Sequence, residues 1–141
     1  MLITDLNFYG ESYSIREAAY LFLSEAGPTP NKTKQMIRKA IDDRRELRIY
    51  YVSPNADTAN PNGWRIVHPH AFGYSGGGGL LMRAWQPNVD RGISFSKHKP
   101  EWRLFRTDGI TKVELLNTHF QKHPDFRKGD RSMVGGLITE L

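Results

Sequence analysis

The sequence predicts an α+β domain in which N-terminal helices precede five short strands that form a partly open antiparallel β-barrel. Three observations predict this class. The chain has 141 residues, which suits one domain. The spacing of apolar residues changes from helical to alternating near Leu47. Short alternating segments separated by turn residues then follow, and a barrel suits them because it hides strand edges.

Two helices are predicted before this change of period. Ser14 and Glu17 have the spacing of a capping box, and apolar residues then recur at helical intervals until Gly27 and Pro28. We therefore expect a helix over 14–26. A second apolar stripe with a basic edge predicts a helix over 32–46.

Five strands are predicted at 47–52, 64–68, 80–85, 101–107 and 110–117. Pro69 is expected to end the second strand or to place it at an edge. Asp108-Gly109 is a hairpin signal between the last two strands. The tail after them fits a strand or a short helix equally well. One helix followed by five such strands is the order of an Sm-like or SH3-like barrel.

The chain divides into three parts on this interpretation: a helical extension (1–31), the barrel domain (32–118) and a C-terminal extension (119–141). Charge is uneven along it, since residues 1–30 carry one basic and four acidic residues, whereas 31–141 carry nineteen basic and eleven acidic ones. Such a basic excess favours polyanionic partners. A merely solubilising surface is the alternative.

Several classes of protein are excluded by composition. The chain has no cysteine, so it has no disulfides, no thiol nucleophile and no thiolate zinc site. There is no long apolar run to span a membrane and no signal peptide at the N-terminus. We therefore expect a cytoplasmic protein with no membrane partner.

The motifs that carry chemistry are weak. The four glycines of 76–79 are followed by a strand and no Lys-Ser or Lys-Thr pair, so they predict a hairpin loop and not a phosphate loop. His68 and His70 share no obvious third ligand, and Asp42 and Asp43 diverge on a helix. We predict no metal, no cofactor and no enzymatic activity.

The arginines are more informative. Strand alternation puts Arg83 and Trp85 on one face of the third strand, and Arg103 and Phe105 on one face of the fourth. Guanidinium groups bind phosphate and rings stack on bases, so this pattern indicates a nucleic-acid surface. The alternative is that the rings pack the core and the arginines lie at its edge.

The order of four segments resembles the WYL domain family. Residues 40–51 look like its opening helix and strand, and 65–69 like its Arg-x-Val-x-Pro step. Residues 80–85 hold Leu-Leu-Met where the Trp-Tyr-Leu triplet belongs, followed by Arg-Ala-Trp. Residues 102–110 look like the closing Phe-Arg-Leu-Asp-Arg-Ile, with Gly109 in place of the second arginine.

The resemblance implies a prokaryotic Sm-like module that senses a nucleic acid or nucleotide, single-stranded by our expectation, and regulates a partner in transcription or defence. Members often carry a helix-turn-helix domain first, for which the acidic start of this chain is too short. Arginines would hold phosphate and other side chains would stack or hydrogen-bond. The candidate ligand-binding residues are Arg65, Arg83, Arg106, Arg103, Tyr51, His68 and Trp85.

Two other interpretations stay open. An SH3-like barrel without a nucleic-acid ligand could bind a protein partner, or a second copy of itself, through an exposed strand edge. An enzyme is the weakest alternative because no catalytic constellation is visible. For Arg83 we expect an anionic ligand and not a carboxylate partner, because the strands predicted beside it hold more Arg and His than Asp and Glu.

Overall fold

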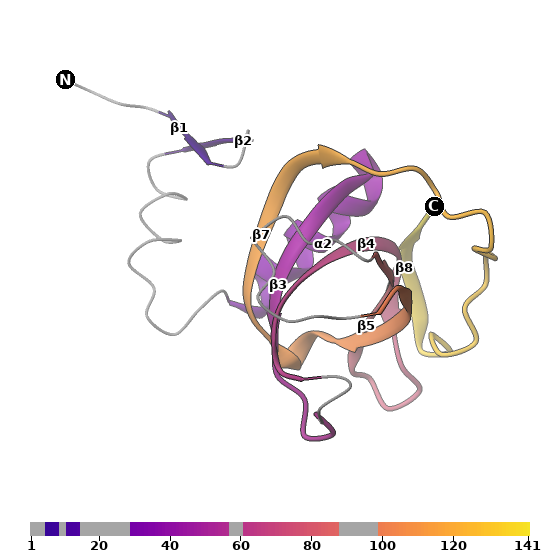
Figure 1. Cartoon of the computed structure of the whole chain (residues 1–141). Coiled ribbons are helices and arrows are strands. Elements are labelled where there is room, and N and C mark those ends of the chain that lie inside the picture. The colour runs from indigo at the N-terminus through magenta and orange to yellow at the C-terminus, as the bar shows by residue number, and fades with distance from the viewer. Residues whose placement is uncertain (1–4, 9–10, 15–28, 57–60, 88–98) are drawn as a thin grey trace.

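The computed structural model describes residues 5–8, 11–14, 29–56, 61–87 and 99–141 (Figure 1). Its elements are β1 (Asp5–Phe8), β2 (Glu11–Ser14), α2 (Pro30–Asp43), β3 (Arg45–Tyr51), β4 (Gly63–Tyr74), β5 (Leu80–Gln86), β6 (Glu101–Arg106), the 3-10 turn η1 (Thr107–Gly109), β7 (Ile110–His119) and β8 (Gly136–Glu140). In this part of the chain a single helix is followed by a six-stranded antiparallel sheet that is not closed. The α+β class is therefore confirmed, with six strands in the main sheet instead of five.

The N-terminal region contains a separate antiparallel pair, β1 with β2. The predicted helix over 14–26 falls outside the described residues apart from Ser14, which ends β2. Helix α2 corresponds to the predicted 32–46 segment but starts earlier and ends earlier. It begins at Pro30 after Thr29, whose hydroxyl accepts a hydrogen bond from the Lys32 amide at 3.2 Å.

The end of α2 is set by Arg44, which adopts a left-handed conformation with φ 53°. Its amide donates to the carbonyl oxygens of Ala40 and Ile41, which closes the last turn. The next residue already belongs to β3, so the helix cannot continue to 46 as predicted. The apolar stripe of α2 packs on the inner face of the sheet, where Ile37 and Ile41 are buried.

The main sheet has the order β6-β5-β4-β3-β7, and β8 pairs with β4 beside this path. Strand β4 is long because it serves three partners: its first part pairs with β3, and its last part pairs with both β5 and β8. The prediction that Pro69 ends this strand or places it at an edge is wrong. The register shift between Pro69 and Ala71 lets β4 bend and continue to Tyr74.

The predicted hairpin at Asp108-Gly109 is also wrong. Strands β6 and β7 lie at opposite ends of the strand order, and η1 carries the chain from one to the other. A Cβ on Gly109 would lie 2.7 Å from a ring carbon of Tyr51 and 2.7 Å from the Val52 carbonyl oxygen. A side chain cannot fit there, which explains the glycine where the family pattern has arginine.

The C-terminal extension, whose structure the sequence left open, ends in the strand β8. Before it, residues 120–135 form a segment without helix or strand, which we call the strap. The strap packs Phe126 and Met133 against Ala71 and Leu81 of the sheet. The sheet therefore has two apolar layers: an inner one under α2 and a smaller outer one under the strap.

Candidate functional site

The candidate residues lie on two faces of the sheet. In the strand register Arg65 pairs with the buried Ile49 and Arg103 pairs with the buried Ala84, which puts both arginines on the inner face. His68 pairs with Trp85 on the outer face. The residues on the inner face are Tyr51, Arg65 and Arg103. Those on the outer face are His68, Arg83 and Trp85. Arg106 is the last residue of β6. These residues therefore do not form one site.

Arg65 is a buried cation with 2% of its surface exposed. Its Nη1 donates to Gln86 Oε1 at 3.1 Å and its Nη2 donates to the Pro61 carbonyl oxygen at 2.8 Å. The guanidinium lies 5.4 Å from the Tyr51 ring centroid and 5.6 Å from that of Phe105. Burial, with the nearby positive charge of Arg103, lowers the pKa of Arg65 to about 10. Arg65 stays protonated at neutral pH, and its hydrogen bonds connect the loop at Pro61 to Gln86 of β5.

The remaining inner residues also make internal contacts. The Tyr51 hydroxyl accepts a hydrogen bond from the Arg106 amide at 3.1 Å, so Tyr51 holds the end of β6. Arg103 Nη1 donates to Glu101 Oε1 at 3.2 Å. The Arg106 side chain is 70% exposed and pairs with Asp108 at 2.9 Å, and this carboxylate raises the pKa of Arg106. Arg106 is thus an exposed cation whose charge is paired with the equally exposed Asp108.

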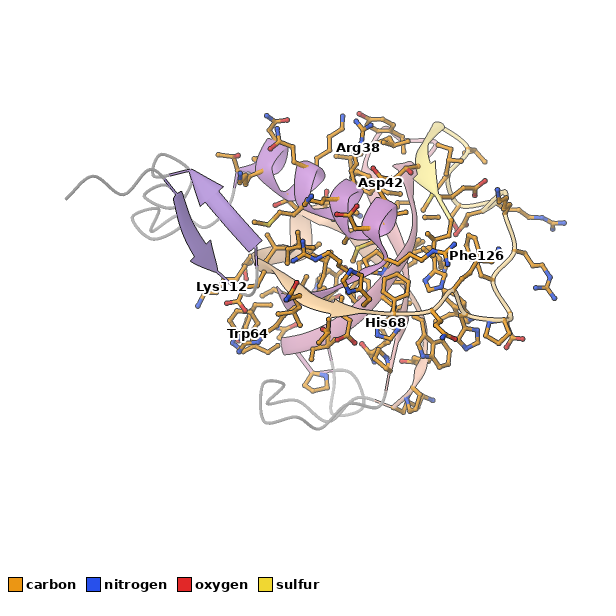
Figure 2. All side chains as sticks on the ribbon, turned by 90° about the horizontal axis from the view of Figure 1, so that it is seen from above. Arg38, Asp42, Trp64, His68, Lys112 and Phe126 are labelled. Atoms are coloured by element: carbon orange, nitrogen blue, oxygen red, sulfur yellow. The ribbon has the colours of Figure 1, made fainter. Side chains whose placement is uncertain are left out.

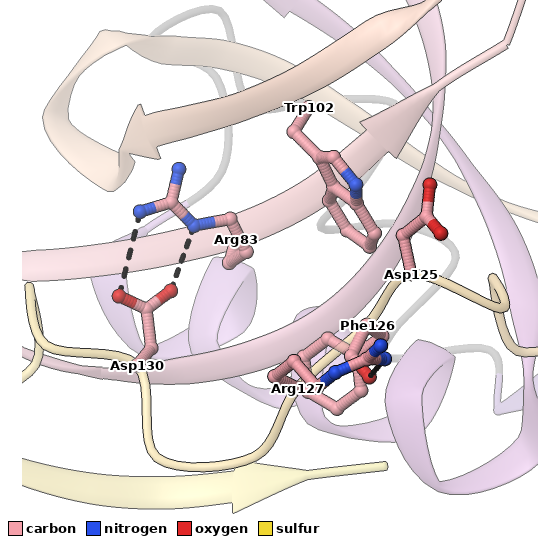
Figure 3. Close-up of a pocket in the computed structure, with 6 residues that line it drawn as sticks. All are labelled: Arg83, Trp102, Asp125, Phe126, Arg127 and Asp130. Atoms are coloured by element: carbon pink, nitrogen blue, oxygen red, sulfur yellow. Dashed lines mark hydrogen bonds and ion pairs between the residues drawn. The ribbon is translucent and has the colours of Figure 1, made fainter.

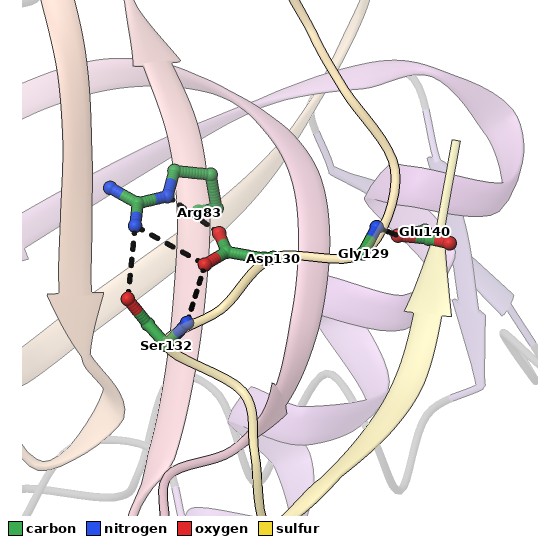
Figure 4. Close-up of polar contacts among 5 residues, drawn as sticks. All are labelled: Arg83, Gly129, Asp130, Ser132 and Glu140. Carbon is green, nitrogen blue, oxygen red and sulfur yellow. Dashed lines mark hydrogen bonds and ion pairs between the residues drawn. The ribbon is translucent and has the colours of Figure 1, made fainter.

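Arg83 on the outer face pairs with Asp130 of the strap (Figure 4). Its Nε donates to Asp130 Oδ2 at 2.7 Å, and its Nη2 contacts Asp130 Oδ1 at 3.4 Å and Ser132 Oγ at 3.3 Å. The Arg83 guanidinium lowers the pKa of Asp130. The expectation that Arg83 has no carboxylate partner is wrong because Asp130 comes from the C-terminal extension and not from a neighbouring strand.

Rings gather beside Arg83 on the same face. Trp85 is paired in register with Trp102 of β6, and their ring centroids are 5.6 Å apart. The His123 ring of the strap lies 4.2 Å from the Trp85 ring centroid. Sequence reasoning missed Trp102 and His123 as site residues. Trp102 could have been found, because it alternates with Leu104 on the face opposite Arg103.

Two histidines hold the strap to the sheet. His70 is fully buried; its Nδ1 lies 2.8 Å from the His68 carbonyl oxygen and its Nε2 accepts from the His123 amide at 2.9 Å. Both contacts require the neutral ring with the proton on Nδ1. Burial lowers the pKa of His70 to about 4. His68 stacks on Phe120 with ring centroids 4.7 Å apart, and its Nε2 lies 2.7 Å from Glu46 Oε2.

A pocket of about 210 Å³ opens between β5, β6 and the strap (Figure 3). Its lining residues are Arg83, Trp102, Asp125, Phe126, Arg127 and Asp130. It joins an indole ring, two guanidinium groups and two carboxylates in one space. Such a set can stack on a planar group and hydrogen-bond to its edge.

The strap also carries four exposed cations, of which Arg127 lines the pocket: Lys122, Arg127, Lys128 and Arg131. A second group of rings and cations lies elsewhere on the sheet, where Arg48 sits 3.9 Å from the Trp64 ring centroid. Figure 2 shows Trp64 and Lys112 at the end of the molecule away from Phe126. The strap and its pocket are thus a separate region.

The part of the chain that the structure describes contains no group of three or more His, Asp or Glu residues that could hold a metal ion. Within the same residues, no helix is long and apolar enough to cross a membrane. The residues that line the pocket can stack, hydrogen-bond and pair with charges.

A family model described as the WYL domain matches residues 32–115. No curated protein matches the chain. Among solved structures, the chain is similar to proteasome accessory factor B/C (PafBC) of Arthrobacter aurescens, at 18% identity and a TM-score of 0.49. That match covers 68% of this chain but only 13% of the PafBC chain. Because the family model spans more than half of its residues, the chain belongs to the WYL domain family.

Proposed function

We propose that this WYL domain is a regulatory ligand-sensing module, not an enzyme, that binds single-stranded nucleic acid or a nucleotide on the outer face of β4, β5 and β6. Ligand binding there would modulate a partner in transcription or defence. One observation carries the proposal: Trp85 and Trp102 lie side by side next to a strap with exposed cations. A cytoplasmic location is part of the same proposal.

Aromatic rings and cations would bind different parts of a single strand. Bases of a single strand are free to stack, and an aromatic ring contributes about 1–3 kcal/mol per stacked base. Lysine and arginine neutralise phosphates and release counterions. Trp102 offers a half-buried ring, and Lys122 and Lys128 offer exposed charge within the same region.

The size of the pocket limits what enters it. A volume of about 210 Å³ is below the roughly 300–1,000 Å³ of sites that enclose a drug-sized ligand. One base or one phosphate fits such a space, while the rest of a strand would run over the strap. Arg83, His68 and Trp85 keep their expected roles here, and Arg106 could reach a phosphate beyond β6.

The inner residues have a different role in this proposal. Arg65, Arg103 and Tyr51 support the sheet from its other face and do not touch the ligand. The strand order β6-β5-β4-β3-β7, with a 3-10 turn between the two edges, supports an Sm-like or SH3-like barrel as the finer description of the fold.

Binding to a protein, or to a second copy of the chain, is the second candidate. Strand β8 is hydrogen-bonded to β4 alone among the described strands, and Leu137 and Val134 nearby are exposed. A partner strand could pair with its other edge. A change of oligomeric state on replacing Leu137 by Lys, with unchanged oligonucleotide binding, would favour this candidate.

The test is fluorescence anisotropy with a short labelled single strand and with the matching duplex. Wild type should bind the single strand more tightly, with affinity falling as salt rises. Trp102→Leu should weaken binding about tenfold, which is the lower part of the stacking range. Trp64→Leu is the matched control, because it removes an indole outside the strap region. Equal effects of the two variants would contradict the proposal.

A further inference from the structure

We infer that the strap pocket receives one base and selects guanine. The inference rests on the proposed function, because base selection presupposes that a nucleotide or a strand reaches the outer face. It goes further by assigning a discriminating role to Asp125 and Arg127, which lie beyond the residues that the family model matches.

Two rings line the pocket, those of Trp102 and Phe126, and Trp102 also makes edge contacts with the rings of His70, Trp85 and His123. The rings of Trp102 and Phe126 have centroids 6.1 Å apart at an angle of 37°, within the range of about 4.5–7 Å for rings in contact. A base therefore cannot enter between them. Phe126 is buried, whereas Trp102 is half-buried, so an incoming base stacks on the open part of the indole.

The edge of such a base meets Asp125 and Arg127, which flank Phe126 in the chain and line the same pocket (Figure 3). The Asp125 side chain is 79% exposed, and its Oδ2 lies 3.9 Å from Nδ1 of His123, which accepts a hydrogen bond from the Asp125 amide at 3.1 Å. Arg127 uses Nη1 to donate to the Pro124 and Phe126 carbonyl oxygens. Its other donors remain for a ligand.

Asp130 does not compete for the base edge. Both of its oxygens are engaged by Arg83, and Oδ1 also accepts from the Ser132 amide at 2.9 Å. The Arg83–Asp130 ion pair therefore forms one side of the pocket and carries no net charge. The base edge is then recognised by one carboxylate, Asp125, and one guanidinium, Arg127.

Guanine matches this pair of groups. Its O6 and N7 are the acceptors that arginine contacts in a bidentate manner. Its N1–H and N2 amino group are adjacent donors that a carboxylate accepts together. Adenine would turn the N1 lone pair toward Asp125. Uracil would offer it one N3–H donor flanked by two carbonyl oxygens that repel the carboxylate. Cytosine presents an amino donor beside an unprotonated ring nitrogen, which repels the carboxylate.

The experiment is a tryptophan-fluorescence titration of the whole chain with GMP, AMP, CMP and UMP at one ionic strength. GMP should bind about tenfold more tightly than the others, as expected for one good bidentate contact. IMP, which lacks the N2 amino group, should bind less tightly than GMP. Equal affinity for the four nucleotides, preference for another base, or no nucleotide binding would overturn the inference.

Variants separate this inference from the proposed function. Asp125→Asn should remove the difference between GMP and IMP while leaving the salt-dependent binding of single strands in place. Asp108→Asn is the matched control, because it removes an exposed carboxylate outside the pocket, and it should keep that difference. If strands bind with the expected salt dependence but GMP has no advantage, guanine selection fails and the proposed function stands.

Discussion

Arg65 and Arg83 lie on β4 and β5 of the same sheet, but they face opposite sides of it. Arg65 is buried on the inner face, and its hydrogen bonds go to the neutral oxygens of Gln86 and Pro61. The Arg83 side chain keeps 26% exposure on the outer face and pairs with the Asp130 carboxylate. Arg65 is therefore a fixed part of the core. Arg83 is paired with a carboxylate, that of Asp130, which a phosphate of a ligand could replace.

The difference follows from strand parity. A cation on the inner face loses its contact with water when the core packs over it, and a missing hydrogen bond there is costly. An outer-face cation stays near solvent, where a carboxylate contact contributes little net stability. The two arginines therefore predict different responses to substitution: loss of stability for Arg65 and a change of ligand binding for the Arg83 region.

Arg65→Ala should have the largest effect on folding. It removes two hydrogen bonds, leaves Gln86 Oε1 unsatisfied and opens a cavity, so we expect a loss of about 3 kcal/mol in the free energy of unfolding. Urea denaturation measures it. Arg65→Met preserves most of the volume and should lose about 1 kcal/mol. A stable Arg65→Ala protein that has lost only oligonucleotide binding would show that the inner face is a ligand site.

Acid should weaken the attachment of the strap through His70. The unfolded chain binds this proton near pH 6.5 and the folded protein near pH 4, so the unfolded state holds more protons between these values. Stability is full above about pH 6.5 and falls on acidification toward pH 4, by an amount on the order of 2–3 kcal/mol.

Urea midpoints measured between pH 7 and pH 4 would check this dependence. His70→Gln should flatten the stability profile in this window, because glutamine does not titrate. His119→Gln, at an exposed position, is the control and should keep the wild-type profile. An unchanged profile in His70→Gln would mean that other groups dominate acid unfolding.

Asp130→Asn should have opposite effects on stability and binding. It weakens the contact with Arg83, which costs about 1 kcal/mol of stability for a pair that is partly open to solvent, with 26% of the Arg83 side chain exposed. It also frees the guanidinium and removes one negative charge from the strap, so single strands should bind a few-fold more tightly. Denaturation and anisotropy of the same preparation measure both. Weaker binding would show that Asp130 itself contacts the ligand.

Arg106→Ala should have the smallest effect. Its side chain is 70% exposed and pairs only with the adjacent turn residue Asp108. We expect no measurable change in stability and at most about a twofold loss of oligonucleotide affinity, since Arg106 is not among the residues that line the pocket. A tenfold loss would move the binding surface toward the end of β6.

The sequence predicted five of the strands, β3 to β7, and the parity of their residues, because alternation is a local pattern, whereas β1, β2 and β8 were not predicted. The helix α2 and the neighbouring strand β3 were found from the change of period near Leu47. The predicted ends of these elements were wrong where tertiary contacts determine them. At Arg44, for example, a left-handed conformation ends α2, and β3 begins earlier than predicted.

Long-range contacts could not be predicted in this way. Asp130 reaches Arg83 across 47 positions, and His123 reaches His70 across 53. The strap has no periodic pattern, so nothing local indicates which face of the sheet it covers. The crossover at Gly109 looked like a hairpin because both structures use the same turn residues.

The central claim is that single strands bind along the strap. Its most direct test is the salt dependence of affinity after replacing all four exposed strap cations by Gln: Lys122, Arg127, Lys128 and Arg131. The matched control replaces two exposed lysines and two exposed arginines elsewhere: Lys39, Lys112, Arg38 and Arg44.

Each cation that contacts a phosphate of a single strand contributes about 0.7 to the slope of log affinity against log salt. If all four strap cations make such contacts, the strap variant should lose about 2–3 from this slope, and the control should stay close to wild type. A full slope in the strap variant, with a flattened slope in the control, would contradict the account and move the binding surface to the side of Lys112.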